Sequence, residues 1–108
     1  MTSLTNDRPL SEIYKEAGDD WVEKDAIARL REETKSLRFA QRCQTLGDIP
    51  VNRAEQTIKG STDWYEEVIQ DVGARTAANK TKVYMESVKM RHSEHTNDEA
   101  NHRAESRL

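Results

Sequence analysis

Most of this chain carries its apolar residues three or four positions apart, which is the period of an α-helix with one apolar face. Between residues 20 and 46 neither glycine nor proline interrupts the pattern. We therefore predict a long helix over 20–46. At about 100° per residue, its main stripe consists of Val22, Ala26, Ile27, Leu30, Thr34, Leu37 and Ala40, with Trp21, Phe39, Cys43 and Leu46 on the opposite side.

A second long helix is predicted from residue 62 to residue 92 or beyond. Gly73 falls inside it, where a single glycine is tolerated. One stripe runs along this helix, and such a stripe favours packing on another helix. Residues 93–108 are almost entirely polar, so we expect a polar helical overhang or tail there. The stripe consists of Tyr65, Ile69, Val72, Thr76, Val83 and Met90, with Asn79 and Glu86 as polar interruptions.

Breaks in the pattern define the remaining segments. Residues 1–9 are expected to be flexible, and a short helix over 10–17 is expected to end at Gly18. The sequence GDIPVN at 47–52 predicts a turn, because glycine suits a helix C-terminus and a proline shortly afterwards prevents the helix from continuing. A second short helix is predicted over 52–59.

Pairs of polar residues mark the expected helix starts. The spacing is that of a capping box, in which two side chains each accept from the other residue's backbone N–H. No segment alternates with the period of a β-strand. The predicted fold class is therefore all-α: an antiparallel hairpin of two long helices with short flanking helices. We expect a single domain over 1–108, either closed by its own helices or completed by oligomerisation. The pairs are Asp20 with Glu23, Asn52 with Glu55 and Asp63 with Glu66.

The composition argues against a thick core. Hydrophobic residues make up 34% of the chain, against roughly 45–50% in an ordinary globular domain. Cys43 is the single cysteine, so no internal disulfide can form and a reducing compartment is the simplest setting. No apolar run is long enough to span a membrane, and MTSLTNDRPL does not resemble a secretory signal. We expect a soluble cytosolic protein, with no membrane partner.

Charge is concentrated in blocks. The 74–91 segment carries five basic residues and only Glu86 as an acid. In an antiparallel hairpin these bases would lie beside the acidic half of the first long helix, which favours pairing within the chain. The alternative is nucleic-acid binding, with cations on phosphates and nearby aromatic rings on bases. The net charge of −3 does not decide between them. The basic residues are Arg75, Lys80, Lys82, Lys89 and Arg91.

The histidines gather near the C-terminal end. His92, His95, Glu99 and His102 are spaced to share one helix face, and Glu99-x-x-His102 matches one element of di-iron helical bundles. Such bundles need two of these elements, and this chain has one. Apolar neighbours that would orient ligands are also missing. We expect a solvated helix end and no cofactor, with His95, Glu99 and His102 as a weak alternative metal site.

Neither catalysis nor a substrate site is indicated by the sequence. Cys43 stands at helical spacing from Phe39 and Leu46, as a small buried hydrophobic residue would, and no base is placed beside it. No phosphate-binding loop, dinucleotide fingerprint or nucleophile–base motif occurs. We expect a protein that is not an enzyme.

Four aromatic residues are candidates for contact with a partner protein. Trp and Tyr side chains are typical energetic centres of protein interfaces, and an aromatic ring on the back of a helix is costly to leave in water. The same residues would serve equally well to close a small core with the short helices. They are Trp21, Phe39, Trp64 and Tyr84.

The last 45 or so residues carry a familiar layout, with a fainter trace in LGDIPVNRAE. It consists of Ala74-Arg75-Thr76-Ala77-Ala78-Asn79, then Lys82, Tyr84 and Glu86, then Met90-Arg91 with Glu94, and a closing Arg103-Ala104-Glu105. In these features the chain resembles a loose group of small all-helical proteins encoded by bacteriophages and prophages. The resemblance implies an accessory protein in a bacterial cell and supplies no activity, cofactor or catalytic residue.

The sequence thus favours a non-enzymatic helical protein-binding module. We expect a phage-encoded accessory protein that inhibits, or serves as adaptor for, a host or phage nucleic-acid machine. One alternative is direct nucleic-acid binding through the basic 75–91 face. Another is a structural helical protein that associates with copies of itself, for which a homo-oligomer would be the partner.

Overall fold

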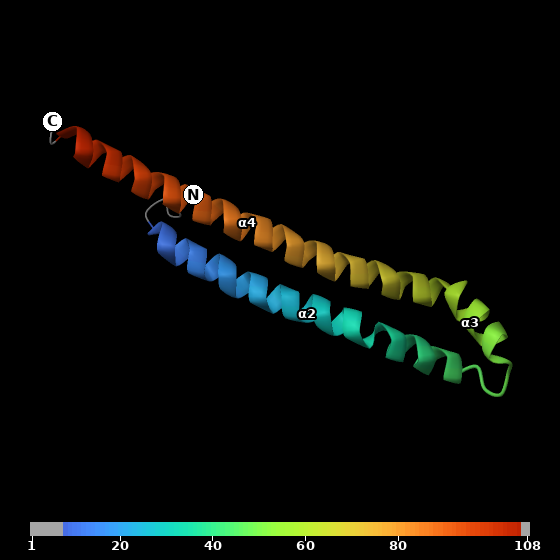
Figure 1. Ribbon diagram of the computed structural model, residues 1–108. Helices are drawn as coiled ribbons and strands as arrows, with labels where there is room; N and C mark the ends of the chain where they lie inside the picture. Colours follow the sequence, from blue (N-terminus) through green and yellow to red (C-terminus); the bar gives the residue numbers. More distant parts are fainter. Residues whose placement is uncertain (1–7, 107–108) are drawn as a thin grey trace, which may run out of the picture. The chain divides into compact units, whose positions relative to one another are not determined.

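The computed structural model describes residues 8–106, and these form three helices. They are α2 (Leu10–Gln44), α3 (Val51–Lys59) and α4 (Thr62–Ser106) (Figure 1). The two long helices, α2 and α4, run antiparallel, with the short α3 between them in the chain. The all-helical hairpin expected from the periodicity is confirmed. Of the N-terminal segment expected to be flexible, residues 1–7 lie outside the described part of the chain.

Helix α2 passes through Gly18 without a break, which corrects the expected short helix over 10–17. A lone glycine within a helix costs only about 1 kcal/mol, whereas a break would remove several backbone hydrogen bonds. Gly18 also packs on the neighbouring helix, since a Cβ atom there would lie 3.6 Å from the Met85 sulfur. Asp20 and Glu23, expected to begin a helix, therefore lie inside one.

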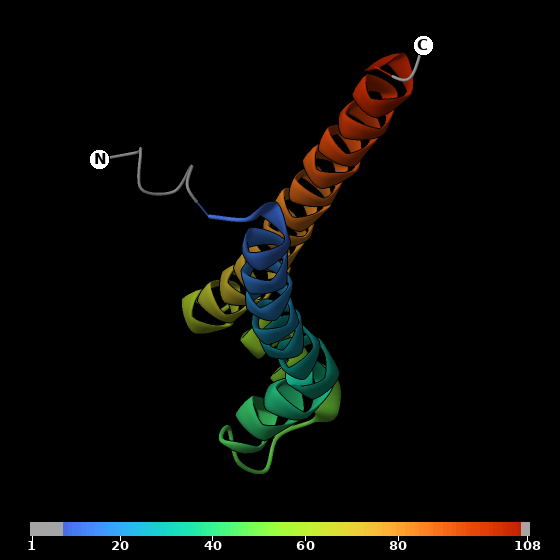
Figure 2. The ribbon, with the colours of Figure 1, turned by 90° about the vertical axis from the view of Figure 1, so that its left-hand side faces the viewer.

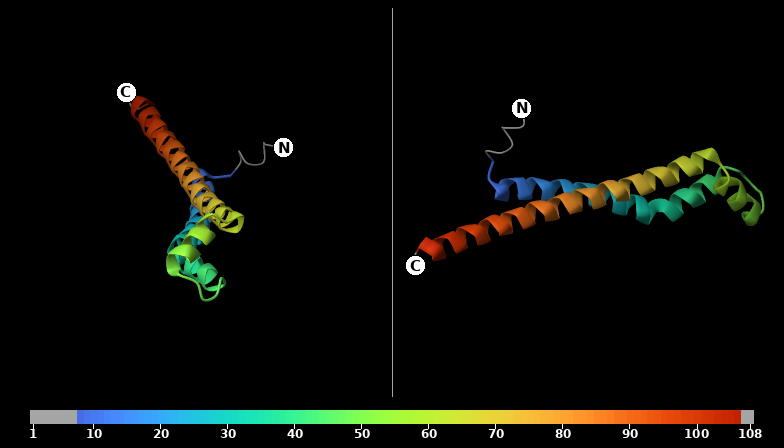
Figure 3. Two further views of the ribbon diagram at one scale, coloured as in Figure 1. Left: turned by 90° about the vertical axis from the view of Figure 1, so that its right-hand side faces the viewer. Right: turned by 90° about the horizontal axis from the view of Figure 1, so that it is seen from above.

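The contacts divide the described chain into two compact units, where the sequence suggested a single domain. In the terminal unit, residues 8–23 pack against residues 79–106, and Figure 2 shows the first turns of α2 beside α4. The turn unit comprises residues 24–78 and contains α3, which lies beside the end of α2 and the start of α4 (Figure 3). Helix α4 continues through the predicted polar overhang to Ser106.

The turn between the helices uses other capping residues than expected. Gly47 adopts a left-handed conformation with φ of 80°, as its place after α2 requires. Pro50, not Asn52, precedes the first residue of α3 and makes no side-chain cap. At the start of α4 the Ser61 hydroxyl accepts a hydrogen bond from the Trp64 N–H at 3.2 Å. Serine is therefore the N-cap there, in place of the expected Asp63.

The interior of each unit is thin and built largely from small residues. In the turn unit Ala28 and Ala78 are completely buried, and Ile58 and Trp64 are the larger buried apolar residues. In the terminal unit Val88 is the largest completely buried side chain among the described residues. Alanines allow two helices to approach closely, but they remove little apolar surface from water. The remaining apolar surface must therefore lie outside.

Candidate protein-binding surfaces

The large apolar side chains of both long helices are mostly on the outside. The stripe of the second long helix favours packing on another helix, and the structure corrects this: Val72 is 60% exposed, and Leu30 in the stripe of the first long helix is 63% exposed. Among the described residues, eleven large hydrophobic side chains are more than half exposed. They are Val22, Ile27, Leu30, Leu37, Val51, Tyr65, Ile69, Val72, Val83, Tyr84 and Met90.

Two surfaces of the turn unit follow from these residues. We call Ile27, Leu30 and Leu37 the α2 stripe, and Tyr65, Ile69 and Val72 the α4 stripe. Within each stripe the residues are three, four or seven positions apart, so they share one helix face. Both stripes lie on continuous helices, α2 and α4.

Ion pairs, and not the apolar side chains of the stripes, occupy the interface between α2 and α4 in the turn unit. The Asp71 carboxylate is buried and its Oδ1 accepts from Arg31 Nε at 2.8 Å and from Arg38 Nη2 at 2.8 Å. Arg38 also bonds to Glu67, and Arg42 Nη2 lies 3.5 Å from Glu67 Oε1. These three arginines of α2 therefore join α4 through two carboxylates. The second oxygen of Asp71, Oδ2, is buried and has no hydrogen-bond partner in the described part of the chain.

Arg75 makes the next connection in the turn unit. Its guanidinium contacts Glu32 through two atoms, Nε at 2.9 Å and Nη2 at 2.6 Å, and donates to Asp25 Oδ1 at 2.8 Å. These hydrogen bonds raise the pKa of Arg75 above its ordinary value and lower the pKa of Glu32. Arg75 was a candidate for nucleic-acid binding, and the structure places it against the acidic half of the first helix.

The other basic candidates lie in the terminal unit. The Lys82 ammonium group stands 5.8 Å from the centre of the Trp21 ring, in a cation–π contact. Lys80, Lys89 and Arg91 are exposed on α4. The structure does not gather the five residues around one groove, and nucleic-acid binding by them stays a prediction.

The four aromatic candidates fall into two groups. In the turn unit Trp64 is buried, with its ring centre 5.1 Å from that of Phe39, and Lys59 stands over the Phe39 ring at 5.9 Å. Trp64 and Phe39 thus close the end of the helix pair. In the terminal unit Trp21 is half-buried, while Tyr84 is 51% exposed. Contact of these residues with a partner stays a prediction.

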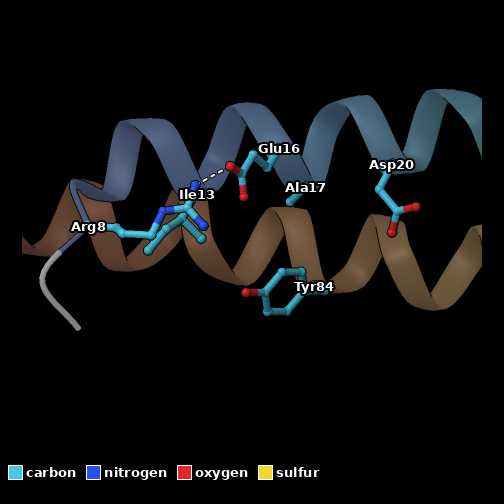
Figure 4. Close-up of a pocket in the computed structure, with 6 residues that line it drawn as sticks. All are labelled: Arg8, Ile13, Glu16, Ala17, Asp20 and Tyr84. Atoms are coloured by element: carbon cyan, nitrogen blue, oxygen red, sulfur yellow. Dashed lines mark hydrogen bonds and ion pairs between the residues drawn. The ribbon is translucent and has the colours of Figure 1, made fainter. Parts of the chain in front are cut away.

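Tyr84 lines a shallow groove of the terminal unit of about 350 Å³. Figure 4 shows its ring on α4, together with the other lining residues, which come from Arg8 and the beginning of α2. Arg8 bonds to Glu16 beside it, which raises the pKa of Arg8 and lowers that of Glu16. Both groups are solvent-accessible, so the groove is an open surface feature and lacks the enclosure of a small-molecule site.

The residues of the histidine-rich end of α4 are all exposed as far as Ser106. His95 Nε2 lies 3.0 Å from Glu99 Oε1, as an exposed pair one helical turn apart. His102 is not part of this contact. Within residues 8–106, no group of three or more His, Cys, Asp or Glu side chains is placed to hold a metal ion.

Comparison with known proteins gives no relative from which a role could be transferred. No family model matches the chain, and neither a curated protein nor a solved structure is significantly similar to it. None of the helices in the described residues is both long enough and apolar enough to cross a membrane.

Proposed function

We propose that this protein is a non-enzymatic helical protein-binding module that acts through the α2 stripe and the α4 stripe. One observation carries the proposal: the six large side chains of the two stripes are exposed, while small alanines and ion pairs occupy the contact between α2 and α4 beside them. Covering apolar surface contributes about 25 cal/mol per Å². A protein partner that covers the stripes would therefore gain binding free energy from them.

The resemblance of residues 64–108 to phage-encoded helical proteins supports a more specific proposal. On that basis the protein is a phage accessory protein that inhibits, or serves as adaptor for, a host or phage nucleic-acid machine. Such a role requires a protein-binding surface and no catalytic group. In the terminal unit the exposed Tyr84 would be a further anchor, because Tyr is enriched among the residues that dominate binding energy.

The test is affinity capture from a bacterial lysate, with and without nuclease, using tagged wild-type protein and single variants. We expect Leu30→Glu and Val72→Glu each to abolish capture of proteins that the wild type retains, in both conditions. The control is Gln56→Glu, which adds the same charge at an exposed position of α3 and should leave capture unchanged. Circular dichroism verifies that the variants remain helical. Equal capture by all four proteins would contradict the proposal.

A second candidate, nucleic-acid binding, has the exposure of Lys80, Lys89 and Arg91 in its favour. It requires an affinity that falls steeply with added salt. A gel shift at low salt tests it, and the absence of any shift would remove this candidate.

A further inference from the structure

We propose that the partner covering the stripes is a second copy of this chain, with the α2 stripe of one copy on the α4 stripe of the next. This inference rests on the proposed function, since it names the partner of the same surfaces. It draws on three features of the turn unit: the sides on which the stripes lie, their levels along the helices, and the apolar area that they offer.

The two stripes lie on different sides of the helix pair. Val72 lines a groove of about 280 Å³ together with Glu32 and Lys35 of α2. Glu32 follows Leu30 by two residues, which is about 200° around the helix. Leu30 therefore points away from the side on which Val72 lies. A twofold contact of one stripe with itself would leave the other stripe in water. Contact of the α2 stripe with the α4 stripe of the next copy covers both stripes of a copy when it repeats along a ring or an open row of copies.

The two stripes also lie at the same level along the helices. Arg31 bonds to Asp71, so the adjacent residues Leu30 and Val72 are level with each other. Phe39 contacts Trp64, which brings the following residue, Tyr65, to the region of Leu37. Copies set side by side without a shift along the helix axis would thus bring one stripe onto the other. The facing helices would be antiparallel, as α2 and α4 are within one chain.

The apolar area fits an interface of ordinary size. Large side chains offer on the order of 150–250 Å² when aromatic and somewhat less when aliphatic. The six side chains of the stripes are each more than half exposed, which gives on the order of 600 Å² across one such contact. Specific interfaces bury about 1,200–2,000 Å² in total, of which somewhat more than half is apolar. The stripes supply about the apolar share of an interface at the lower end of that range.

Disulfide trapping in a Cys43→Ser background distinguishes this arrangement from others. We expect a mixture of Leu30→Cys and Val72→Cys chains to form a covalent dimer of the two under mild oxidation, while each chain alone forms little. A disulfide needs Cα atoms about 4.4–6.8 Å apart, so trapping reports direct contact. The control mixture pairs Leu30→Cys with Gln56→Cys, a position on α3 outside both stripes, and should form no covalent dimer of the two chains.

Two outcomes would overturn the inference. Covalent dimers of Leu30→Cys alone, without the mixed product, would show a twofold contact instead. No trapping in any mixture, together with a monomeric mass of the wild type by light scattering, would exclude a second copy altogether. If lysate capture still depended on Leu30 and Val72 in that case, the proposed function would stand with a different partner. If the Leu30 and Val72 substitutions also left lysate capture unchanged, both the proposed function and the self-association through the stripes would be refuted.

Discussion

Asp71 shows at the residue scale why the interior of the turn unit is polar. Its carboxylate is buried and bonds to two arginines of α2. The sequence analysis did not predict this contact. A signal was present, because helical spacing and opposite charges could have suggested a row of ion pairs between Arg31 and Arg38 on one helix and Glu67 and Asp71 on the other. Those charges suit a solvated face equally well, so spacing alone does not reveal that Asp71, and not its neighbour Val72, lies inside.

Replacing Asp71 by Asn tests this contact. The substitution removes the charge that Arg31 and Arg38 share and leaves them beside each other. Because the arginines retain some contact with water, we expect a loss of about 2 kcal/mol in the free energy of unfolding, below the full cost of breaking a buried pair. Urea denaturation measures it. Glu66→Gln, at the exposed next position to Glu67, is the control and should change stability little.

Glu32 predicts a pH dependence. The hydrogen bonds from Arg75 lower the pKa of Glu32 in the folded protein below its ordinary value of 4.5. A lowered carboxyl pKa contributes stability that is fully present above 4.5 and is lost as pH falls through the folded value. Melting temperatures between pH 7 and pH 3 should therefore fall less steeply for Glu32→Gln than for the wild type. Glu33→Gln keeps the Arg75 contact and should follow the wild type; a Glu32→Gln curve parallel to wild type would refute the assignment.

At the scale of helices, periodicity predicted which residues share a face but not which face meets which helix. The expected starts of α3 and α4 agree with the structure to within a residue, and α2 ends at Gln44, two residues before the expected end at 46. The expected stripes are correct as helix faces and wrong as the contact between helices. Hydrophobicity alone favoured burying Leu30 and Val72, whereas small residues such as Ala28 and Ala78 permit closer helix approach with ion pairs alongside.

The substitutions Ala28→Leu and Ala26→Leu distinguish which face of α2 packs against α4: the face that carries Ala28 or the apolar stripe that carries Ala26. Ala28 is completely buried, whereas Ala26 is exposed and belongs to the main apolar stripe of the first long helix. Overpacking a filled interior costs about 1–3 kcal/mol, so Ala28→Leu should lower the midpoint of thermal unfolding clearly and Ala26→Leu should not. The reverse order would mean that the stripes do face each other within one chain.

At the scale of the whole molecule, the thin interior and the exposed stripes are two results of the same packing: apolar side chains that the interior does not take up lie on the surface. In a chain with 34% hydrophobic residues, the aliphatic side chains of the two stripes lie on the outside of the turn unit, whereas Ala28 and Ala78 lie inside it. The composition left two possibilities open, a fold closed by its own helices and one completed by oligomerisation. The sequence alone could not indicate which surface another copy would cover, because the exposed surface depends on which face of each helix forms the contact within the chain.

The mass of the purified protein in solution tests the central claim most directly. We predict that multi-angle light scattering of the wild type gives a multiple of the 12.4 kDa chain mass that falls on dilution, and that Leu30→Glu and Val72→Glu give single chains with unchanged helicity. Gln56→Glu should behave as the wild type does. A wild-type mass of one chain at the highest attainable concentration would contradict the claim that the stripes are covered by a second copy.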